Sequence, residues 1–159
     1  MTTTERTAVR KSIVVKATPE RAFEVFTAGF DCWWPRGHHL IDDDLDHVGI
    51  EPRVGGRCYE TTKDGRTCTW GRVLSWDPPH ALSYTWEIQA DWAVVPPEGG
   101  PASTVTVTFT ATDGGTRVEI AHEGLDVHGP GWQRMRDSID GEQGWNGMLV
   151  AYAAVAEQP

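Results

Sequence analysis

The sequence predicts an α+β fold of the helix-grip type, in which a curved antiparallel sheet of six or seven strands wraps around a long C-terminal helix. Three observations support this fold. A strand-like segment followed by a short helix opens the chain, about six strand-like segments then come in succession, and 132–157 has helical spacing of its apolar residues. A sheet of this kind must bury one face, and only the last segment is long and apolar enough to cover it.

The first two elements are indicated by local sequence. Residues 9–16 form an apolar-rich segment that predicts a strand. Thr18 can cap a helix and Pro19 suits the first helical position. The apolar residues that follow predict a short helix ending near Gly29, and 31–46 is predicted to be irregular.

Closely spaced strands are predicted in the middle of the chain. Glycine and aspartate between them supply the positive φ that short hairpins need, and proline ends a ladder. Strict alternation over 104–112 and the turn at 113–115 make the last hairpin the clearest one. The predicted strands are 47–53, 56–63, 66–76, 80–89, 104–112 and 116–122, with a proline-rich loop at 94–101.

Glycines interrupt the C-terminal helical pattern. Apolar residues recur with helical spacing from Trp132 and again from Trp145, with Gly141, Gly144 and Gly147 between or within the two runs. Each interior glycine costs about 1 kcal/mol relative to alanine. We therefore expect a kink, or two consecutive helices, near Gly141.

Length and charge limit the classes of function. A chain of 159 residues fits one domain, taken here as 1–159 with 1–7 disordered. Its 23 acidic and 14 basic residues give a formal charge of -9, which disfavours binding to nucleic acid. Neither a run of about 18 to 20 apolar residues nor a signal-peptide pattern is present, so we expect a cytoplasmic protein without a membrane span.

The three cysteines predict neither a disulfide framework nor a zinc site, since their number is odd and no CxxC spacing occurs. Reduced thiols are expected. Cys58 and Cys68 lie on strands either side of a short turn, so a disulfide between them is the alternative if the two face one another.

Short motifs occur in order along nearly the whole chain. They are Ala17–Phe23, Trp33–Pro35, Arg53–Arg57, Asp64-Gly65, Trp70–Leu74, Pro78–His80, Thr85-Trp86, Gly115–Val118, His122–Gly124 and Gly144-Trp145. Together they resemble the Hsp90-ATPase-activator-like (AHSA-type) branch of the START/Bet v 1 (SRPBCC) superfamily. The resemblance implies a cavity between the sheet and the C-terminal helix. Members of the superfamily include lipid and hormone carriers, polyketide cyclases and aromatases, oxygenase subunits and a co-chaperone domain.

Strand alternation predicts which side chains face the helix. Residues two apart share a face, which places Cys58 with Glu60 on one strand, and Trp70 with Arg72 on the next. We take Cys58, Glu60, Trp70 and Trp86 as facing the helix. The family pattern has a large apolar residue at position 58, so the small cysteine leaves room there.

The indoles of Trp70, Trp86, Trp132 and Trp145 have two interpretations of equal weight. One is ordinary core packing. The other is a ligand pocket, favoured because a buried indole NH needs a partner and because aromatic walls with a few polar groups are typical of small-molecule sites. Trp33 and Trp34 follow the first helix; one is expected to pack under the sheet and the other to cover the opening, and the sequence does not say which.

Glu60 and His122 are the candidate catalytic residues. A carboxylate on an inward face is costly to bury, so a partner or a raised pKa is expected for Glu60. His122 follows Val118 and Ile120 on their face, and the pair could act as general base and acid. The favoured alternative is a Glu60 at the rim, in water or paired with Arg72.

A metal site is not predicted. Asp42, Asp44 and Asp46 mimic the start of a calcium loop, but His47 stands where that loop requires glycine and Arg53 where it requires glutamate. The adjacent His38 and His39 are poorly placed to bind one ion together. No cofactor is expected.

The leading hypothesis is a monomer or homodimer that binds a small hydrophobic molecule, aromatic or polycyclic, between the sheet and the C-terminal helix. A cyclase- or hydrolase-type enzyme using Glu60 and His122 is the second, and a chaperone-partner or stress-response regulatory module is the third. The expected lining residues are Trp34, Cys58, Glu60, Trp70, Trp86, His122, Trp132 and Met135.

Overall fold

The computed structural model describes residues 7–34, 45–92, 101–142 and 144–158, and every structural statement below concerns these residues. Several sequence predictions fall outside them, namely the disorder of 1–6, the histidines and aspartates of 38–44 and most of the loop at 94–101. Thr7 is described, and its carbonyl accepts a hydrogen bond from the amide of Leu125 at 2.9 Å.

The elements follow the predicted order, with two short helices added. The chain begins with β1 (Val9–Val15), α2 (Pro19–Thr27) and the one-turn helix α3 (Phe30–Trp33). The remaining strands are β2 (Leu45–Ile50), β3 (Arg57–Thr62), β4 (Thr67–Asp77), β5 (Ala81–Trp86), β6 (Ser103–Thr112) and β7 (Gly115–Glu123). The 3₁₀ helix η1 (Leu125–His128), α4 (Trp132–Asp140) and α5 (Trp145–Ala156) follow.

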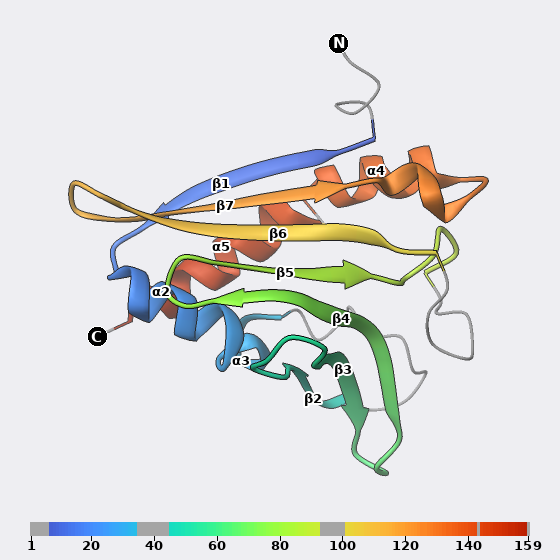
Figure 1. Cartoon of the computed structure of the whole chain (residues 1–159), viewed down its shortest axis with the longest axis horizontal. Helices are drawn as coiled ribbons and strands as arrows, with labels where there is room; N and C mark the ends of the chain where they lie inside the picture. The colour runs from blue at the N-terminus through green and yellow to red at the C-terminus, as the bar shows by residue number, and fades with distance from the viewer. Residues whose placement is uncertain (1–6, 35–44, 93–100, 143, 159) are drawn as a thin grey trace.

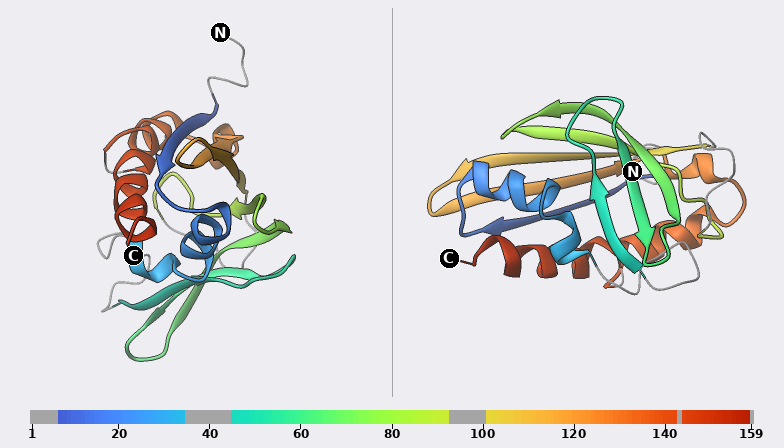
Figure 2. Two further views of the ribbon diagram at one scale, coloured as in Figure 1. Left: turned by 90° about the vertical axis from the view of Figure 1, so that its left-hand side faces the viewer. Right: turned by 90° about the horizontal axis from the view of Figure 1, so that it is seen from below.

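The described strands form one antiparallel sheet in the order β1-β7-β6-β5-β4-β3-β2, shown in Figure 1. The last strand of the chain therefore pairs with the first, with Val9 opposite His122. Figure 2 shows the sheet curled, with α2, α3 and α5 on its concave side. This arrangement confirms the predicted helix-grip α+β fold.

Helix α2 forms as its sequence predicts. The Thr18 hydroxyl accepts a hydrogen bond from the amide of Arg21 at 3.1 Å, and Pro19 occupies the first turn. The apolar face is buried under the sheet, where Phe23 contacts Trp76 and Phe109.

Helix α5 is held against the N-terminal elements of the fold. Its buried residues are Trp145, Met148, Leu149, Tyr152 and Ala156, with the spacing of one helical face. The Tyr152 hydroxyl donates to the carbonyl of Ala22 at 2.7 Å, which ties α5 to α2. The carboxylate of Glu157 accepts from the amide of Lys16 at 2.9 Å, just beyond β1.

The C-terminal segment is two helices, as the glycines predict. The chain turns sharply between α4 and α5. A Cβ at Gly144 would lie 2.1 Å from the carbonyl oxygen of Ile139, so no other residue fits without moving the backbone. The ion pair between Lys11 and Asp140, at 2.6 Å, joins α4 to β1 just before this break.

Strand β4 departs from strict alternation. Its register shifts once against β3 and once against β5, and as a result Trp70 and Val73, three residues apart, are both buried. The expectation that Trp70 and Arg72 share a face by simple alternation is therefore wrong. Period-2 counting fails wherever a bulge adds a residue.

Two strands end earlier than the sequence predicts. The strand predicted at 80–89 ends at Trp86, because the Gln89 side-chain amide donates to the carbonyls of Glu87 and Pro101 and turns the chain away. The strand predicted at 47–53 ends at Ile50. Helix α3 lies in the segment predicted as irregular, and one turn is too short for periodicity to reveal.

The alternative of a Cys58–Cys68 disulfide is wrong. Cys58 is opposite Gly71 in the β3–β4 pair, whereas Cys68 is opposite Glu60. None of the three cysteines forms a disulfide, and Cys58 is buried, Cys68 half-buried and Cys32 exposed.

Candidate functional site

Four tryptophans meet on the concave face of the sheet. We call Trp34, Trp70, Trp86 and Trp145 the indole cluster. Ring centroids are 5.9 Å apart between Trp34 and Trp70, 5.5 Å between Trp70 and Trp86, and 6.2 Å between Trp86 and Trp145. The ring centroids of Trp34 and Trp145 are 6.5 Å apart, so each indole contacts two others of the cluster. Each indole is at most 8% exposed.

The β4 bulge places Trp70 in this cluster. A Cβ at Gly71 would lie 2.2 Å from the carbonyl oxygen of Thr85, so the missing side chain lets β4 approach β5 closely. The carbonyl of Trp70 accepts from the amide of Glu87 at 2.9 Å beyond the end of β5. Trp70 is thereby fixed over Tyr84 and Trp86, at 5.9 and 5.5 Å.

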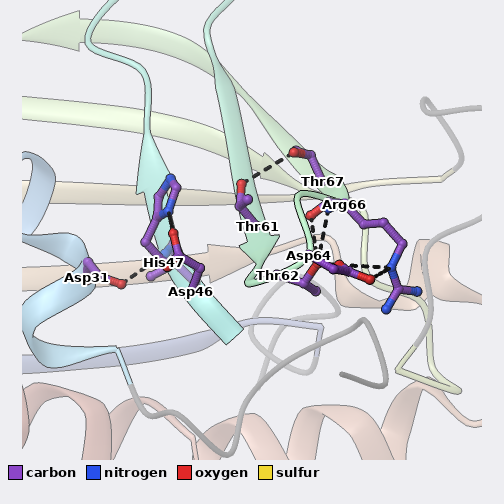
Figure 3. A network of polar contacts seen from close by, with 9 residues as sticks. Asp31, Asp46, His47, Thr61, Thr62, Asp64, Arg66 and Thr67 are labelled. Carbon is purple, nitrogen blue, oxygen red and sulfur yellow. Dashed lines mark hydrogen bonds and ion pairs between the residues drawn. The ribbon is translucent and has the colours of Figure 1, made fainter. Parts of the chain in front are cut away.

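Helix α3 brings Trp34 to the same place. Asp31 accepts a hydrogen bond from the amide of Val48 at 3.0 Å, which fastens α3 to the edge strand β2 (Figure 3). Trp33 is held against α2 and α5: its indole NH donates to the carbonyl of Val25 at 3.0 Å and its ring contacts Tyr152. Its ring also lies 6.0 Å from that of Trp34. Trp34, and not Trp33, therefore faces the indole cluster, and both are buried.

Figure 3 also shows the hydrogen bonds and ion pairs of the neighbouring polar residues. His47 pairs with Asp46 at 2.7 Å. Asp64 accepts from the hydroxyl of Thr62 and from Arg66, and these bonds, the Thr62 bond first, lower the pKa of Asp64 to about 2. These groups stabilise the turn between β3 and β4 and lie away from the indole cluster.

A buried chain of hydrogen bonds lies beside the indole cluster. His122 is bonded through Nδ1 to the indole NH of Trp145 at 3.3 Å and through Nε2 to the hydroxyl of Ser103 at 2.8 Å. The same hydroxyl is 2.8 Å from Nε2 of His128, whose Nδ1 is 2.8 Å from Oε1 of Gln89. The side-chain amide of Gln89 completes the chain by donating to two backbone carbonyls.

The directions of the bonds in this chain follow from two facts: an indole NH only donates, and the amide oxygen of Gln89 only accepts. His122 therefore accepts at Nδ1, carries its proton on Nε2 and donates to Ser103. The serine hydroxyl must then donate to His128, which carries its proton on Nδ1 and donates to Gln89. Both histidines are neutral in this arrangement and each has a defined tautomer.

Burial keeps these histidines neutral. Desolvation, with a smaller effect of His128, lowers the pKa of His122 to about 3, and desolvation also lowers the pKa of His128. His122 is fully buried and its ring is 5.0 Å from Trp86. The network thus orients Trp145 and leaves His122 without a free nitrogen.

Two donors of strand β5 stand apart from this network. Tyr84 and Trp86 are two residues apart on one face, and the Tyr84 hydroxyl and the Trp86 indole NH are buried without a hydrogen-bond partner. Cys58 lies close enough to influence Tyr84. Burial raises the pKa of both the Cys58 thiol and the Tyr84 hydroxyl, so both stay protonated.

Glu60 and His122 are both buried, but they do not lie on neighbouring strands. Glu60 is on β3 and is 2% exposed, so it does not lie in water at an open rim. His122 is on β7, and β4, β5 and β6 separate the two strands. A second buried carboxylate, Glu87, accepts from the Thr85 hydroxyl at 2.8 Å.

Trp132 and Met135 lie on α4, which packs against η1 and β1. Met135 is buried and Trp132 is half-buried against the core. Among the described residues, no ring contact joins Trp132 to the indole cluster.

Sequence reasoning omitted several residues from the expected lining. Tyr84 was identifiable, because it precedes Trp86 by two residues on the same strand face. Trp145 was weighed as an indole but not selected. Nothing in the sequence points to the Ser103–His128–Gln89 chain, whose members meet only through the fold.

A groove of about 510 Å³ lies on the opposite, outer face of the sheet. Polar side chains of β1, β6 and β7 line it, and the ion pair between Arg10 and Glu123 crosses it at 3.0 Å. Its polarity does not match the apolar ligand that the sequence predicts.

Other site classes find little support in the described residues. No group of three or more metal-binding side chains occurs among them, and none of their helices is long and apolar enough to cross a membrane. The large apolar side chains that are exposed come from six different segments: Val14, Val54, Leu74, Trp92, Val127 and Val150.

Comparison with known proteins identifies the family. The model described as "Activator of Hsp90 ATPase homolog 1-like protein" matches residues 16–156. The chain belongs to this family. The resemblance predicted from the sequence motifs is thus confirmed. No curated protein matches the chain.

Solved structures extend the comparison. An anthrahydroquino-Gama-pyrone synthase, Txn09, complexed with SUM is 43% identical, with 93% of this chain and 96% of that chain covered and a TM-score of 0.64. CalC, a self-sacrificing resistance protein from Micromonospora echinospora, is 28% identical over 94% and 93%, with a TM-score of 0.61. NE0264 from Nitrosomonas europaea, 16% identical over 99% of both chains with a TM-score of 0.69, shares the fold.

Proposed function

We propose that this protein binds a small, planar, polycyclic aromatic molecule between the concave face of the sheet and helix α5. The observation that carries the proposal is the indole cluster: four of the eight tryptophans of the chain lie in one contact group, contributed by the end of α3, β4, β5 and α5. Aromatic faces bind planar rings by stacked or edge-to-face contacts, each of which is worth about 0.5–1.5 kcal/mol.

The comparisons support this class of ligand. The relative that is 43% identical over nearly the whole chain has a name that denotes an oxygenated fused aromatic product. A lipid carrier, which the superfamily also contains, would need a surface for a long alkyl chain. The indole cluster consists of aromatic rings instead, and this composition favours a flat aromatic ligand.

Binding can be measured directly by equilibrium dialysis with fluorene and phenanthrene as aromatic probes, and with palmitate as the alkyl comparison. We expect the aromatic probes to bind and palmitate to bind much more weakly. Native mass spectrometry of the protein purified from its own host would then reveal any retained small molecule. Absence of binding by every aromatic probe would refute the proposal.

A substitution locates the site. Trp70→Leu removes the central indole and is expected to weaken fluorene binding about tenfold, the loss of one to two ring contacts. Trp76→Leu is the matched control, because Trp76 is on the same strand but contacts Phe23 of α2. Equal effects of the two substitutions would place the ligand elsewhere. Far-ultraviolet circular dichroism establishes that both variants are folded.

A second candidate is an enzyme that closes or hydrolyses a ring on such a ligand, favoured by the synthase named above. Of the two expected acid–base residues, Glu60 suits proton transfer better, since His122 has both nitrogens engaged and a pKa of about 3. Glu60→Gln is expected to abolish turnover while ligand binding remains. Full activity of that variant would exclude Glu60 from the chemistry.

A further inference from the structure

Strand β5 carries two buried donors for which the described part of the chain provides no hydrogen-bond acceptor. The hydroxyl of Tyr84 and the indole NH of Trp86 have no hydrogen-bond partner, although Tyr84 is fully buried and Trp86 is 4% exposed. Most buried polar groups in folded proteins are paired, and an unpaired one costs free energy. Two such groups on one strand face call for a common explanation.

One acceptor would satisfy both groups, and for the indole NH of Trp86 an acceptor is the only possible partner. An indole NH has no lone pair to offer. The Tyr84 hydroxyl keeps its proton, because burial holds its pKa well above 10. The missing partner is therefore a group with lone pairs, such as a carbonyl or ether oxygen.

The donors are bordered by aromatic and neutral surface. Trp70 contacts both residues edge-on, with ring centroids 5.9 Å from Tyr84 and 5.5 Å from Trp86. Cys58, beside Tyr84, is buried as a neutral thiol. Glu87 is close enough to raise the pKa of that thiol. Arg72 acts on the pKa of the same thiol in the opposite sense. A buried carboxylate ligand would need a charged partner of its own, whereas a neutral carbonyl would not.

We propose that Tyr84 and Trp86 form a two-donor subsite that binds a carbonyl oxygen of a planar polycyclic ketone whose rings rest on the indole cluster. The inference rests on the proposed function and narrows it from aromatic molecules in general to oxygenated ones. A buried water molecule is the competing occupant, since it would also accept from both donors.

The experiment compares two ligands of the same shape. Fluorene and 9-fluorenone differ in one carbonyl oxygen, and neither alkylates thiols. Equilibrium dialysis gives both dissociation constants for the parent protein and for Tyr84→Phe, which removes only the hydroxyl. Tyr59→Phe is the matched control, because Tyr59 alternates with the buried residues of β3 and contacts His47 and Arg57.

The expected result is that the parent binds fluorenone about tenfold more tightly than fluorene, the net effect of two hydrogen bonds. In Tyr84→Phe this preference is expected to fall to about threefold or less, with fluorene affinity unchanged. Tyr59→Phe should match the parent. The carbonyl stretch of bound fluorenone should move to lower frequency in the parent and partly return in Tyr84→Phe.

The outcomes separate the two proposals. If fluorene and fluorenone bind equally well and Tyr84→Phe has no effect, water occupies the donors and the two-donor subsite is refuted, while aromatic binding stands. If neither ligand binds, the proposed function fails and the subsite with it. The indole NH resonance of Trp86 gives an independent check, since it should shift with fluorenone and much less with fluorene.

Discussion

The buried histidines make a quantitative prediction about stability in mild acid. His122 is neutral in the folded protein, with a pKa of about 3. In the unfolded chain an exposed histidine has a pKa of about 6.5. Below that value the unfolded state binds a proton that the folded state does not, so the free energy of unfolding falls as pH falls.

The magnitude follows from that difference. One histidine with these two values lowers the free energy of unfolding by about 2 kcal/mol between about pH 7.5 and about pH 5, with a limiting slope of about 1.4 kcal/mol per pH unit. His128, whose pKa is also lowered by burial, adds to the effect with the same sign. The loss from His122 continues until the pH approaches about 3.

The pH window isolates the histidines from the carboxylates. Hydrogen bonds lower the pKa of Glu51, chiefly from the Arg57 amide, and of Asp64, chiefly from Thr62. Because folding lowers both pKa values, these carboxylates stabilise the fold at any pH above the pKa that they have in the unfolded chain. That contribution is lost only as the pH falls from there through the lower pKa of the folded protein. Above about pH 5 the histidines therefore dominate the difference.

Urea unfolding followed by tryptophan fluorescence at several pH values measures the slope. The parent is expected to lose stability toward about pH 5, and His122→Gln to show a slope smaller by nearly one proton, whatever its stability at neutral pH. His80→Gln is the control, since His80 is exposed and its removal should leave the parent slope. Equal slopes for the parent and His122→Gln would refute the buried, neutral imidazole.

Two further predictions concern the groups that build the site. Ser103→Ala removes a hydroxyl with two buried hydrogen bonds of 2.8 Å and should lower the free energy of unfolding by about 2–4 kcal/mol. The control Ser75→Ala breaks an exposed hydrogen bond of 2.7 Å and should cost less than about 0.5 kcal/mol. Similar losses in the two variants would contradict the role of burial. Gly71→Ala places a Cβ 2.2 Å from the Thr85 carbonyl and should cost about 1–3 kcal/mol in urea unfolding. In the control Gly141→Ala the new Cβ has ordinary contacts of 3.4 Å or more, so the free energy of unfolding should hardly change. An unchanged free energy of unfolding in Gly71→Ala would show that β4 and β5 leave space for a side chain at position 71.

Much of the fold was predictable because its signals are local. Thr18 and Pro19 mark the start of α2, alternation marks β6 and β7, and the glycines from 141 to 147 mark the break between α4 and α5. Each depends on the conformational preference of a few adjacent residues. The order from β2 to β7 then follows, because each strand pairs with the next one along the chain. Strand β1 pairs with β7 at the other edge of the sheet.

The site was only partly predictable. Trp70 and Trp86 were selected as inward-facing residues, and the structure places both in the indole cluster. Alternation nevertheless mispredicts the face of Arg72, because a bulge depends on contact with the neighbouring strand and leaves little trace in the apolar–polar pattern of the sequence. Trp132 has the same residue type as the indole cluster but lies on α4, apart from it.

The sequence by itself determined the α+β class and the order of the elements, because propensity, turn chemistry and apolar periodicity act over a few residues. Its motifs indicated the family. Only the tertiary structure decided which of Trp33 and Trp34 faces the sheet, which tautomers the buried histidines adopt, and that two donors of β5 remain unpaired. Those properties depend on contacts between residues far apart in the chain, and burial determines their energies.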